Sequence, residues 1–392
     1  MYDRSRGQRH HQGQYLDFAV TPPILVATTS RLTDLVSDLA SCATVAVDTE
    51  SNSLHALRER VCLIQFSTPT ADYIVDPIAL SDLTSLAPFF ASPAHEKIFH
   101  AAEGDLLGLG RDFPFVFANI FDTMSAARTL GWSHVGLAAV LNAEFGVTLS
   151  KRHQRADWGR RPLKAEMLDY ARLDTHYLPA LRDRLHAALV ESGHWPEAQE
   201  DFERVARVQP KPPSPTPDPM AFWRVKGARD LGPQQSAVLE AVFAYRQGQA
   251  ERINQPLFKV IGDSTLLDLA RRAPAHIDDL KPIAGMTPVQ IHRHGRALLL
   301  AVQEGLRASV PPVPIVDRES DDVRDRYDRL HNWRKTRARA RGVESDVILP
   351  RTTIQELARR SPRTLEDLAD IVDFGPRRRE MYGEEILAVV SG

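Results

Sequence analysis

The sequence predicts a mixed α/β domain followed by two small all-helical modules. Three observations support this fold class. Short β-rich runs alternate with helical patterns from residue 21 to residue 207, as in a sheet flanked by helices. Residues 208–219 contain so many prolines that they can form neither a helix nor a central strand, so we expect a linker there. Beyond this linker the pattern is helical only, and part of it recurs.

The α/β domain is expected to contain five strands. Each run is short, apolar and bounded by turn residues: residues 44–47, 61–66, 71–75, 97–100 and 115–121. Apolar residues at helical spacing predict three helices, at residues 32–39, 137–145 and 164–189. Pro162 lies just ahead of the last of these, where the start of a helix tolerates proline.

The helical part repeats at an offset of 88 residues. Residues 266–274 reappear as residues 354–362 with most side chains similar. One fixed offset over such a length indicates two copies of one module. We place the first copy at residues 220–308 and the second at 320–392, with a linker at 309–319. Residues 1–20 are polar and are expected to be flexible.

Composition narrows the range of functions. The chain has 49 basic and 51 acidic residues and a net charge of -2, so it does not coat nucleic acid through bulk basicity, and any polyanion must bind to local patches. Basic runs occur at residues 151–155, 160–161, 334–341 and 377–379, although such runs are also common on solvated helix faces. Two cysteines cannot build a zinc cluster or a disulfide framework, which favours a reducing cytoplasm. No apolar run is long enough for a membrane helix.

Five residues in the α/β domain can form one metal site. Asp48 and Glu50 follow a strand and can point to the same side of it, because alternate residues of an extended chain share a face. Asp105 follows another strand, and Tyr170 and Asp174 share one face of a helix at i and i+4. Carboxylates are the ligands that Mg²⁺ and Mn²⁺ prefer. Two such ions can activate the attacking oxygen and stabilise the leaving oxygen of a phosphodiester.

Basic residues close to this site are candidate contacts for nucleic-acid phosphates. Contacts of this kind hold a strand in register without reading its sequence. The candidates are His100, Lys151, His153, Arg155 and Arg161. For His100, which ends an apolar strand, a structural role is the alternative.

Three motifs resemble those of the DEDD exonuclease superfamily. They are Val47-Asp48-Thr49-Glu50, the segment from His100 to Asp105, and the segment from Tyr170 to Asp174. Tyr170, four residues before the last aspartate, matches the tyrosine-type branch. Asp157-Trp158 with Arg161-Pro162-Leu163 resembles the ribonuclease D family, and the helical modules resemble HRDC domains.

The resemblance implies a ribonuclease H-like fold and a metal-dependent 3′–5′ exoribonuclease that releases 5′-mononucleotides. It implies two divalent metal ions, Mg²⁺ or Mn²⁺, with Asp48, Glu50, Asp105 and Asp174 as their ligands and Tyr170 orienting the attacking water. RNA, especially tRNA precursors with 3′ extensions, is the expected partner, and no membrane or obligatory protein partner is evident. Many relatives carry an aromatic residue after the first motif, but this chain has Ser51 there, so Leu54 and His55 are the candidates for that place at the terminal base.

Two other functions stay open. A DNA 3′–5′ exonuclease could use the same carboxylates, because nothing in the motifs reads the 2′-hydroxyl that distinguishes RNA. A non-catalytic RNA-binding protein could keep the fold. The complete set of clustered acids argues against the second function, since mutual repulsion destabilises them without metal.

Overall fold

The computed structural model describes residues 22–80, 82–211, 218–314 and 318–392. The expected flexible N-terminus lies outside the described residues, as do most of the expected proline-rich linker and part of the linker at 309–319. The described residues form two compact units. One contains the α/β domain with the second helical module, residues 319–392, and the other contains residues 52–60 with the first helical module. Within the described ranges, no helix is long and apolar enough to cross a membrane.

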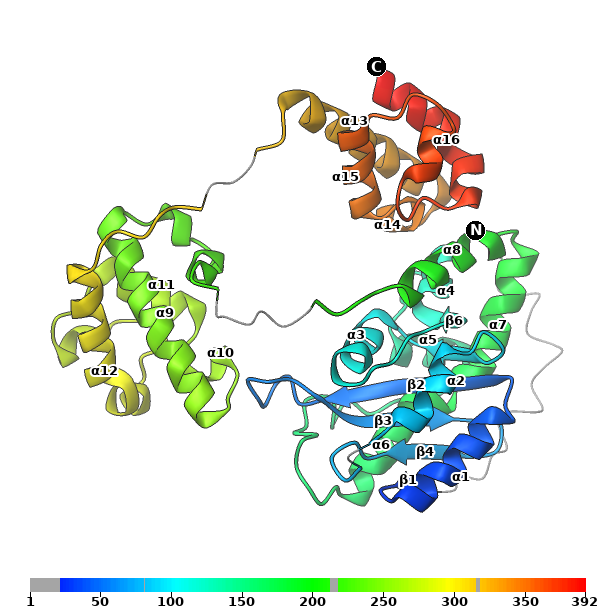
Figure 1. The fold of residues 1–392 in the computed structure, drawn as a ribbon, viewed down its shortest axis with the longest axis horizontal. Coiled ribbons are helices and arrows are strands. Elements are labelled where there is room, and N and C mark those ends of the chain that lie inside the picture. Colours follow the sequence, from blue (N-terminus) through cyan, green and yellow to red (C-terminus); the bar gives the residue numbers. More distant parts are fainter. Residues whose placement is uncertain (1–21, 81, 212–217, 315–317) are drawn as a thin grey trace. The chain divides into compact units, whose positions relative to one another are not determined.

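The α/β domain is built on one six-stranded mixed sheet (Figure 1). Its strand order is β1-β4-β3-β2-β5-β6, and β3 runs antiparallel to both β2 and β4 while the other neighbouring pairs are parallel. The strands are β1 (Ile24–Val26), β2 (Thr44–Ser51), β3 (Val61–Ser67), β4 (Asp72–Val75), β5 (Glu96–Phe99) and β6 (Ile120–Asp122). The expected mixed sheet flanked by helices is therefore confirmed.

Helices cover both faces of this sheet. Alternation along β2 divides the core, because Val45 and Val47 join one apolar cluster whereas Ala46 joins another. The first cluster takes residues from α1, α2 and α3, and the second from α4, α5, α7 and α8. The helix bounds are α1 (Thr29–Ala40), α2 (Ala87–Ala91), α3 (Glu103–Asp112), α4 (Thr123–Thr129), α5 (Leu137–Phe145), α6 (Ala165–His176), α7 (Leu178–Glu191) and α8 (Trp195–Ala206).

Two expected elements differ from the structure. The strand expected at residues 115–121 is formed only at its end, because Asn119 has a φ of 51° and Phe115 turns inward to stack on Phe90. The helix expected at residues 164–189 is two helices, which break at Tyr177. Pro179 explains the break, since proline cannot donate the hydrogen bond that a continuing helix needs. The short strand β1 was not expected at all.

The two helical modules share one frame. The helices α9 (Pro233–Ile253), α10 (Leu257–Val260), α11 (Asp263–Arg272) and α12 (Pro288–Arg307) recur 88 residues later as α13 (Asp321–Arg341), α14 (Ser345–Ile348), α15 (Arg351–Arg360) and α16 (Pro376–Ser391). The last helix of the second copy is shorter. Each module has its own apolar core. The helical modules expected after the α/β domain are confirmed.

The second helical module is joined to the α/β domain by buried ion pairs. Arg378, at the start of α16, is only 1% exposed, and its guanidinium donates to Asp201 at 2.8 Å and to Glu200 at 3.2 Å, both on α8. Arg341, at the end of α13, donates to Glu197 of α8 at 2.6 Å. The basic run at 377–379 is thus not simply a solvated or phosphate-binding surface, because its central arginine is buried against acids of the same chain.

Candidate active site

The first two acids of the site lie on one face of strand β2. Asp48 and Glu50 follow Ala46 at alternate positions, so they point to the face that α6 and α7 cover. Asp48 is paired in register with Gln65 of β3, and Glu50 with Leu63. The register shifts directly after Glu50, which ends the regular pairing at the site. The pattern of alternation therefore predicts correctly which residues of β2 share a face.

The third acid comes from the first turn of α3. Asp105 accepts a hydrogen bond from the Thr49 hydroxyl at 2.5 Å, which ties α3 to the end of β2. The turn from β5 into α3 is held by the carboxylate of Asp122, which accepts the backbone N–H groups of Ala101 and Ala102. Ala101 has a φ of 65°, a conformation that costs energy in a residue with a side chain. Ala101 lies in the turn that positions Asp105, so its backbone strain supports a functional role for this turn.

Helix α6 carries the remaining two candidates, Tyr170 and Asp174, at i and i+4. This helix packs across β2, β3 and β4. Two buried polar contacts attach it to the sheet: Ser67 donates to Thr175 at 2.7 Å, and Arg172 pairs with Asp72 at 3.2 Å. The i, i+4 spacing and these anchors together place the phenol and the carboxylate beside the acids of β2.

The four acids raise one another's pKa. Burial and then the charges of Asp48, Asp174 and Asp105 raise the pKa of Glu50 to about 10. Burial and the charge of Asp105 raise the pKa of Asp174 to about 7. For Asp48, burial and the charge of Asp174 raise the pKa well above its ordinary value. For Asp105, burial and Asp48 do the same, although the hydrogen bond from Thr49 opposes the shift. The structure thus brings the predicted acids into one electrostatic cluster.

This cluster has the chemistry of a divalent-cation site. Four carboxylates offer hard oxygen ligands. Among the described residues, no basic side chain contributes to lowering their pKa values. In the described part of the chain, however, no three Asp, Glu, His or Cys side chains are already arranged as ligands of one ion. The donor set fits a divalent metal, and the side chains would have to adjust their rotamers to bind it.

A cavity of about 250 Å³ lies beside Tyr170 and Asp174. His153 and Arg152, from the loop between α5 and α6, also line it, and Arg152 pairs with Glu166 of α6 at 3.6 Å. The Tyr170 ring packs against the buried ring of Trp158, with centroids 6.0 Å apart, and meets His153 edge-on at 5.8 Å. The Tyr170 ring therefore has an aromatic neighbour in the buried Trp158, and Tyr170 itself lines the cavity.

The structure separates the predicted phosphate contacts into two groups. Lys151 and Arg155 are exposed, and His153 lines the cavity. By contrast, Arg161 is held internally by both carboxylate oxygens of Asp76 at 2.6 Å. His100 is bonded to the Thr123 hydroxyl at 2.9 Å, and burial lowers the pKa of its imidazole. A phosphate contact for either of the last two stays a prediction, and it would have to compete with these bonds.

Leu54 and His55 belong to the other unit. Leu54 is 41% exposed, and His55 lies 3.2 Å from the ammonium of Lys259. Nearby Leu57 packs against the core of the first helical module. The role predicted for Leu54 or His55 at the terminal base stays a prediction.

Sequence reasoning assigned no role in the site to several residues that shape it. Thr49 holds Asp105, and Asp122 holds the turn before it. Gln65, the cross-strand partner of Asp48, is completely buried, and neither atom of its amide bonds to a described residue. A polar residue within an apolar strand was the available signal for Gln65, since a buried amide without a partner is costly.

Comparisons with known proteins identify the domains of this chain. A family model described as a 3′–5′ exonuclease matches residues 23–189, and the HRDC domain model matches residues 235–302 and 323–390. Ribonuclease D of Gluconacetobacter diazotrophicus is 31% identical over 267 residues, which cover 68% of this chain and 67% of that protein. The crystal structure of the catalytic core of RRP6 from Trypanosoma brucei is 28% identical with a TM-score of 0.66, covering 75% of this chain and 82% of that one.

A longer relative shows a similar match. Exosome complex component 10 of Mus musculus is 32% identical over 343 residues, which cover 83% of this chain but only 39% of the mouse protein. The chain therefore spans less than half of that relative. Its match to ribonuclease D extends over two thirds of both proteins. This chain belongs to the ribonuclease D family, with a 3′–5′ exonuclease domain followed by two HRDC domains.

Proposed function

We propose that this protein is a 3′–5′ exoribonuclease that hydrolyses RNA to 5′-mononucleotides. The observation that carries the proposal is the cluster of four acids with raised pKa values, beside a cavity open to Tyr170. A cluster of this kind, which meets no counter-charge among the described residues, suits a reaction that uses bound cations. Membership in the ribonuclease D family supports RNA as the substrate.

Enzymes of this family normally use divalent metals. We propose that Asp48, Glu50, Asp105 and Asp174 hold two ions, Mg²⁺ or Mn²⁺. When bound, such ions activate the attacking water and stabilise the leaving oxygen. The acids must lose their protons to act as ligands, so their raised pKa values make metal affinity increase with pH.

Tyr170 is proposed to position the attacking water. Burial and the nearby charges of Asp174, Glu50 and Asp48 raise the pKa of its phenol above the ordinary value. A phenol with a raised pKa stays protonated at neutral pH, so it can donate a hydrogen bond but is a poor general base. Its contact with Trp158 limits the movement of the ring.

The substrate is proposed to enter through the cavity beside α6. Arg152 and His153 line this cavity, and Lys151 and Arg155 are exposed on the same loop, so they are placed to contact phosphates. We retain tRNA precursors with 3′ extensions as the proposed natural substrate, and the cytoplasm as the proposed location. A DNA exonuclease and a non-catalytic RNA-binding protein are the competing functions.

An assay on labelled strands tests this proposal. A 5′-labelled single-stranded RNA and the matched DNA are incubated with Mg²⁺, with Mn²⁺ or with a chelator. The wild-type protein is compared with Asp48→Asn and with Asp34→Asn, which removes an exposed carboxylate from α1 on the other side of the sheet. We expect a metal-dependent ladder that shortens from the 3′ end of RNA, present in Asp34→Asn and absent in Asp48→Asn.

The other outcomes identify the competing functions. A ladder on DNA alone would assign the site to a DNA exonuclease. RNA binding without cleavage under any metal would favour the non-catalytic protein. Thermal unfolding gives a second readout that does not depend on turnover, because a ligand that binds only the folded state raises the melting temperature. Mg²⁺ or Mn²⁺ should raise the melting temperature of wild type and Asp34→Asn more than that of Asp48→Asn.

A further inference from the structure

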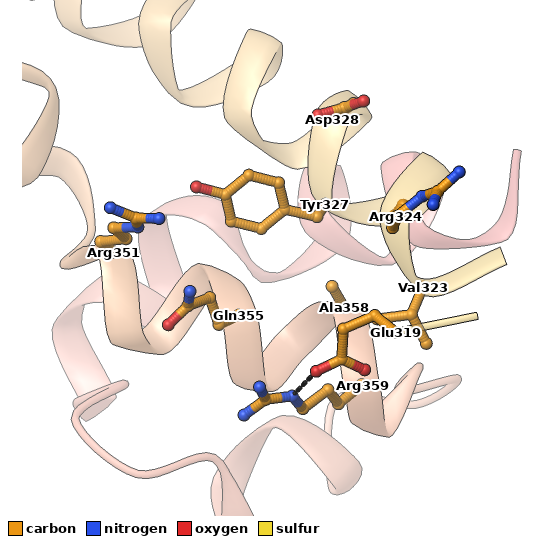
Figure 2. A pocket seen from close by; sticks show the side chains of 9 residues that line it. All are labelled: Glu319, Val323, Arg324, Tyr327, Asp328, Arg351, Gln355, Ala358 and Arg359. Carbon is orange, nitrogen blue, oxygen red and sulfur yellow. Dashed lines mark hydrogen bonds and ion pairs between the residues drawn. The ribbon is translucent and has the colours of Figure 1, made fainter. Parts of the chain in front are cut away.

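The second HRDC domain has a pocket that lies outside the site described above. Its volume is about 320 Å³, and it opens between α13 and α15. The Tyr327 ring lines it from α13 and Gln355 from α15, with Arg351 near the hydroxyl end of the ring (Figure 2). Val323 and Ala358 add apolar surface toward Glu319 and Arg359. An ion pair between Arg359 and Glu319, 2.6 Å long, closes the other end.

The corresponding surface of the first HRDC domain is filled by its own chain. The residues that match Tyr327 and Gln355 there are Leu239 and Leu267, which are 0% and 9% exposed. Residues 220–231 pack on α9 and supply Phe222, Trp223 and Val225 to the core of that domain. Within this segment, a Cβ added to Gly227 would meet Leu267 at 3.0 Å. In the second copy, the described residues directly before α13, residues 318–320, are exposed.

The charge at this place also differs between the copies. In the first domain the buried Arg246 is paired with Asp263 at 2.6 Å. The matching residues of the second domain are Arg334 and Arg351, so two cations replace one ion pair. Arg334 is 7% exposed and donates to the carbonyl of Leu349. Among the described residues no carboxylate lies within ion-pair distance of Arg351, although Asp328 also lines the pocket.

We propose that this pocket of the second HRDC domain binds one unpaired nucleotide of the RNA substrate. The base would stack on Tyr327 with its polar edge on Gln355, and Arg351 would contact the adjacent phosphate. Stacking on an aromatic ring and charge contact with phosphate are how proteins bind single-stranded nucleic acid. The volume suits one base with part of its ribose rather than a duplex. This proposal rests on the proposed function, because it takes RNA as the molecule that this chain handles.

The residues at matching positions of the first HRDC domain provide the substitutions that test whether the pocket binds a nucleotide. Tyr327→Leu and Arg351→Asp place in the second copy the residues that the first copy carries, and Tyr327→Phe keeps the ring. Arg363→Asp, at an exposed position of the same domain, is the control for Arg351→Asp. The probe is a single-stranded RNA of about 12 nucleotides with one 2-aminopurine, used with the full chain in chelator. Anisotropy measures affinity, and the 2-aminopurine fluorescence reports stacking.

We expect Tyr327→Leu to lower affinity roughly 5- to 150-fold, the equivalent of one lost stacking contact, and to remove the fluorescence quenching. Tyr327→Phe should retain both. Arg351→Asp should lower affinity and reduce its salt dependence, whereas Arg363→Asp should do neither. The single-turnover rate of hydrolysis at saturating RNA should change less than about twofold in all four variants.

Wild-type affinity and quenching in Tyr327→Leu would overturn the pocket proposal, as would equal losses in Arg351→Asp and Arg363→Asp. Circular dichroism and the unfolding midpoint show whether Tyr327→Leu is folded, and Tyr327→Phe with Arg351→Asp test the site independently of it. The two proposals fail differently: no hydrolysis by the wild-type protein would overturn the exoribonuclease, whereas normal hydrolysis with unchanged binding by the variants would overturn only the pocket.

Discussion

Two clusters of acids in the exonuclease domain differ in the charges that they face. Glu197, Glu200 and Asp201 on α8 face two arginines of the second HRDC domain, Arg341 and Arg378. The acids of the candidate active site face one another instead. Both groups are held by regular secondary structure. The main difference between them is the counter-charge, although the acids of the candidate active site are also partly exposed.

The pKa values of these acids reflect the difference in counter-charge. Burial pushes the pKa of Glu197 upward, but hydrogen bonds from His194 and Arg341 hold it below its ordinary value. For Glu50, burial and the neighbouring acids act in the same direction and raise the pKa to about 10. Asp201 is intermediate, since burial raises its pKa although Arg378 opposes the shift. An acid group neutralised by its own chain serves structure, whereas one left without a counter-charge is available for a cation.

The largest expected effect is the loss of hydrolysis in Asp48→Asn. Removing a carboxylate from the site should slow single-turnover cleavage at least about a thousandfold, about 4 kcal/mol of barrier. The same change should raise the melting temperature in chelator at neutral pH, because it removes an acid whose charge raises the pKa values of Glu50 and Asp105. Rapid-quench kinetics and thermal unfolding measure the two effects. Hydrolysis at the wild-type rate would remove Asp48 from the site.

The next largest effect is expected at the neutralised cluster. Arg378→Ala leaves Asp201 and Glu200 buried without their main partner, which should destabilise the protein by about 3–5 kcal/mol. Arg379→Ala, whose guanidinium donates only to the carbonyl of Ala369 at an exposed position, should cost about 1 kcal/mol or less. Urea unfolding compares the two variants. Equal stabilities would show that the buried ion pairs do not hold the second HRDC domain in place.

A smaller effect is expected for Tyr170→Phe. The change keeps the ring that packs against Trp158 and removes only the hydroxyl. Turnover should fall about 10- to 100-fold while the affinity for RNA, measured in chelator, stays near that of wild type. Parallel losses of turnover and affinity would indicate that the hydroxyl binds substrate rather than orienting water.

The smallest effect is a change in how stability depends on pH. Glu50 has a folded-state pKa of about 10 and an ordinary value of 4.5, so the folded protein holds a proton that the unfolded chain releases. Without divalent ions, its contribution to stability is complete below pH 4.5 and is lost as pH rises toward 10. With Glu50→Gln, the melting temperature should fall less as pH rises, by on the order of a few degrees. Glu203→Gln, at an exposed position of α8, should retain the decline.

The ion pairs between α8 and the second HRDC domain also affect truncated proteins. Removing residues 319–392 would take away Arg341 and Arg378 together and leave the acids of α8 unpaired. A shortened chain could therefore lose activity through instability rather than through loss of an RNA contact. Point substitutions in the pocket, such as Tyr327→Leu, avoid this ambiguity because they do not touch the ion pairs.

Local patterns were sufficient for most of the elements. Alternation and β-rich composition predicted the cores of β2, β3, β4 and β5, since these signals depend only on neighbouring residues. They failed at residues 115–119, where the aromatic residues look like a strand but the chain turns Phe115 inward against Phe90. They also merged α6 with α7, although Pro179 was a visible signal for the break.

The sequence by itself determined the candidate residues, the repeat of 88 and the resemblance to ribonuclease D, because spacing within a strand, a helix or a duplicated segment is a property of the chain alone. Only the tertiary structure decided which charges meet. Nothing local in sequence indicates that Arg378 is buried against α8 while Arg351 lines an open pocket. Nor does it indicate that Gln65 lies beside Asp48. Charge interactions act through space between residues far apart in the chain, so their outcome depends on how the helices and strands pack.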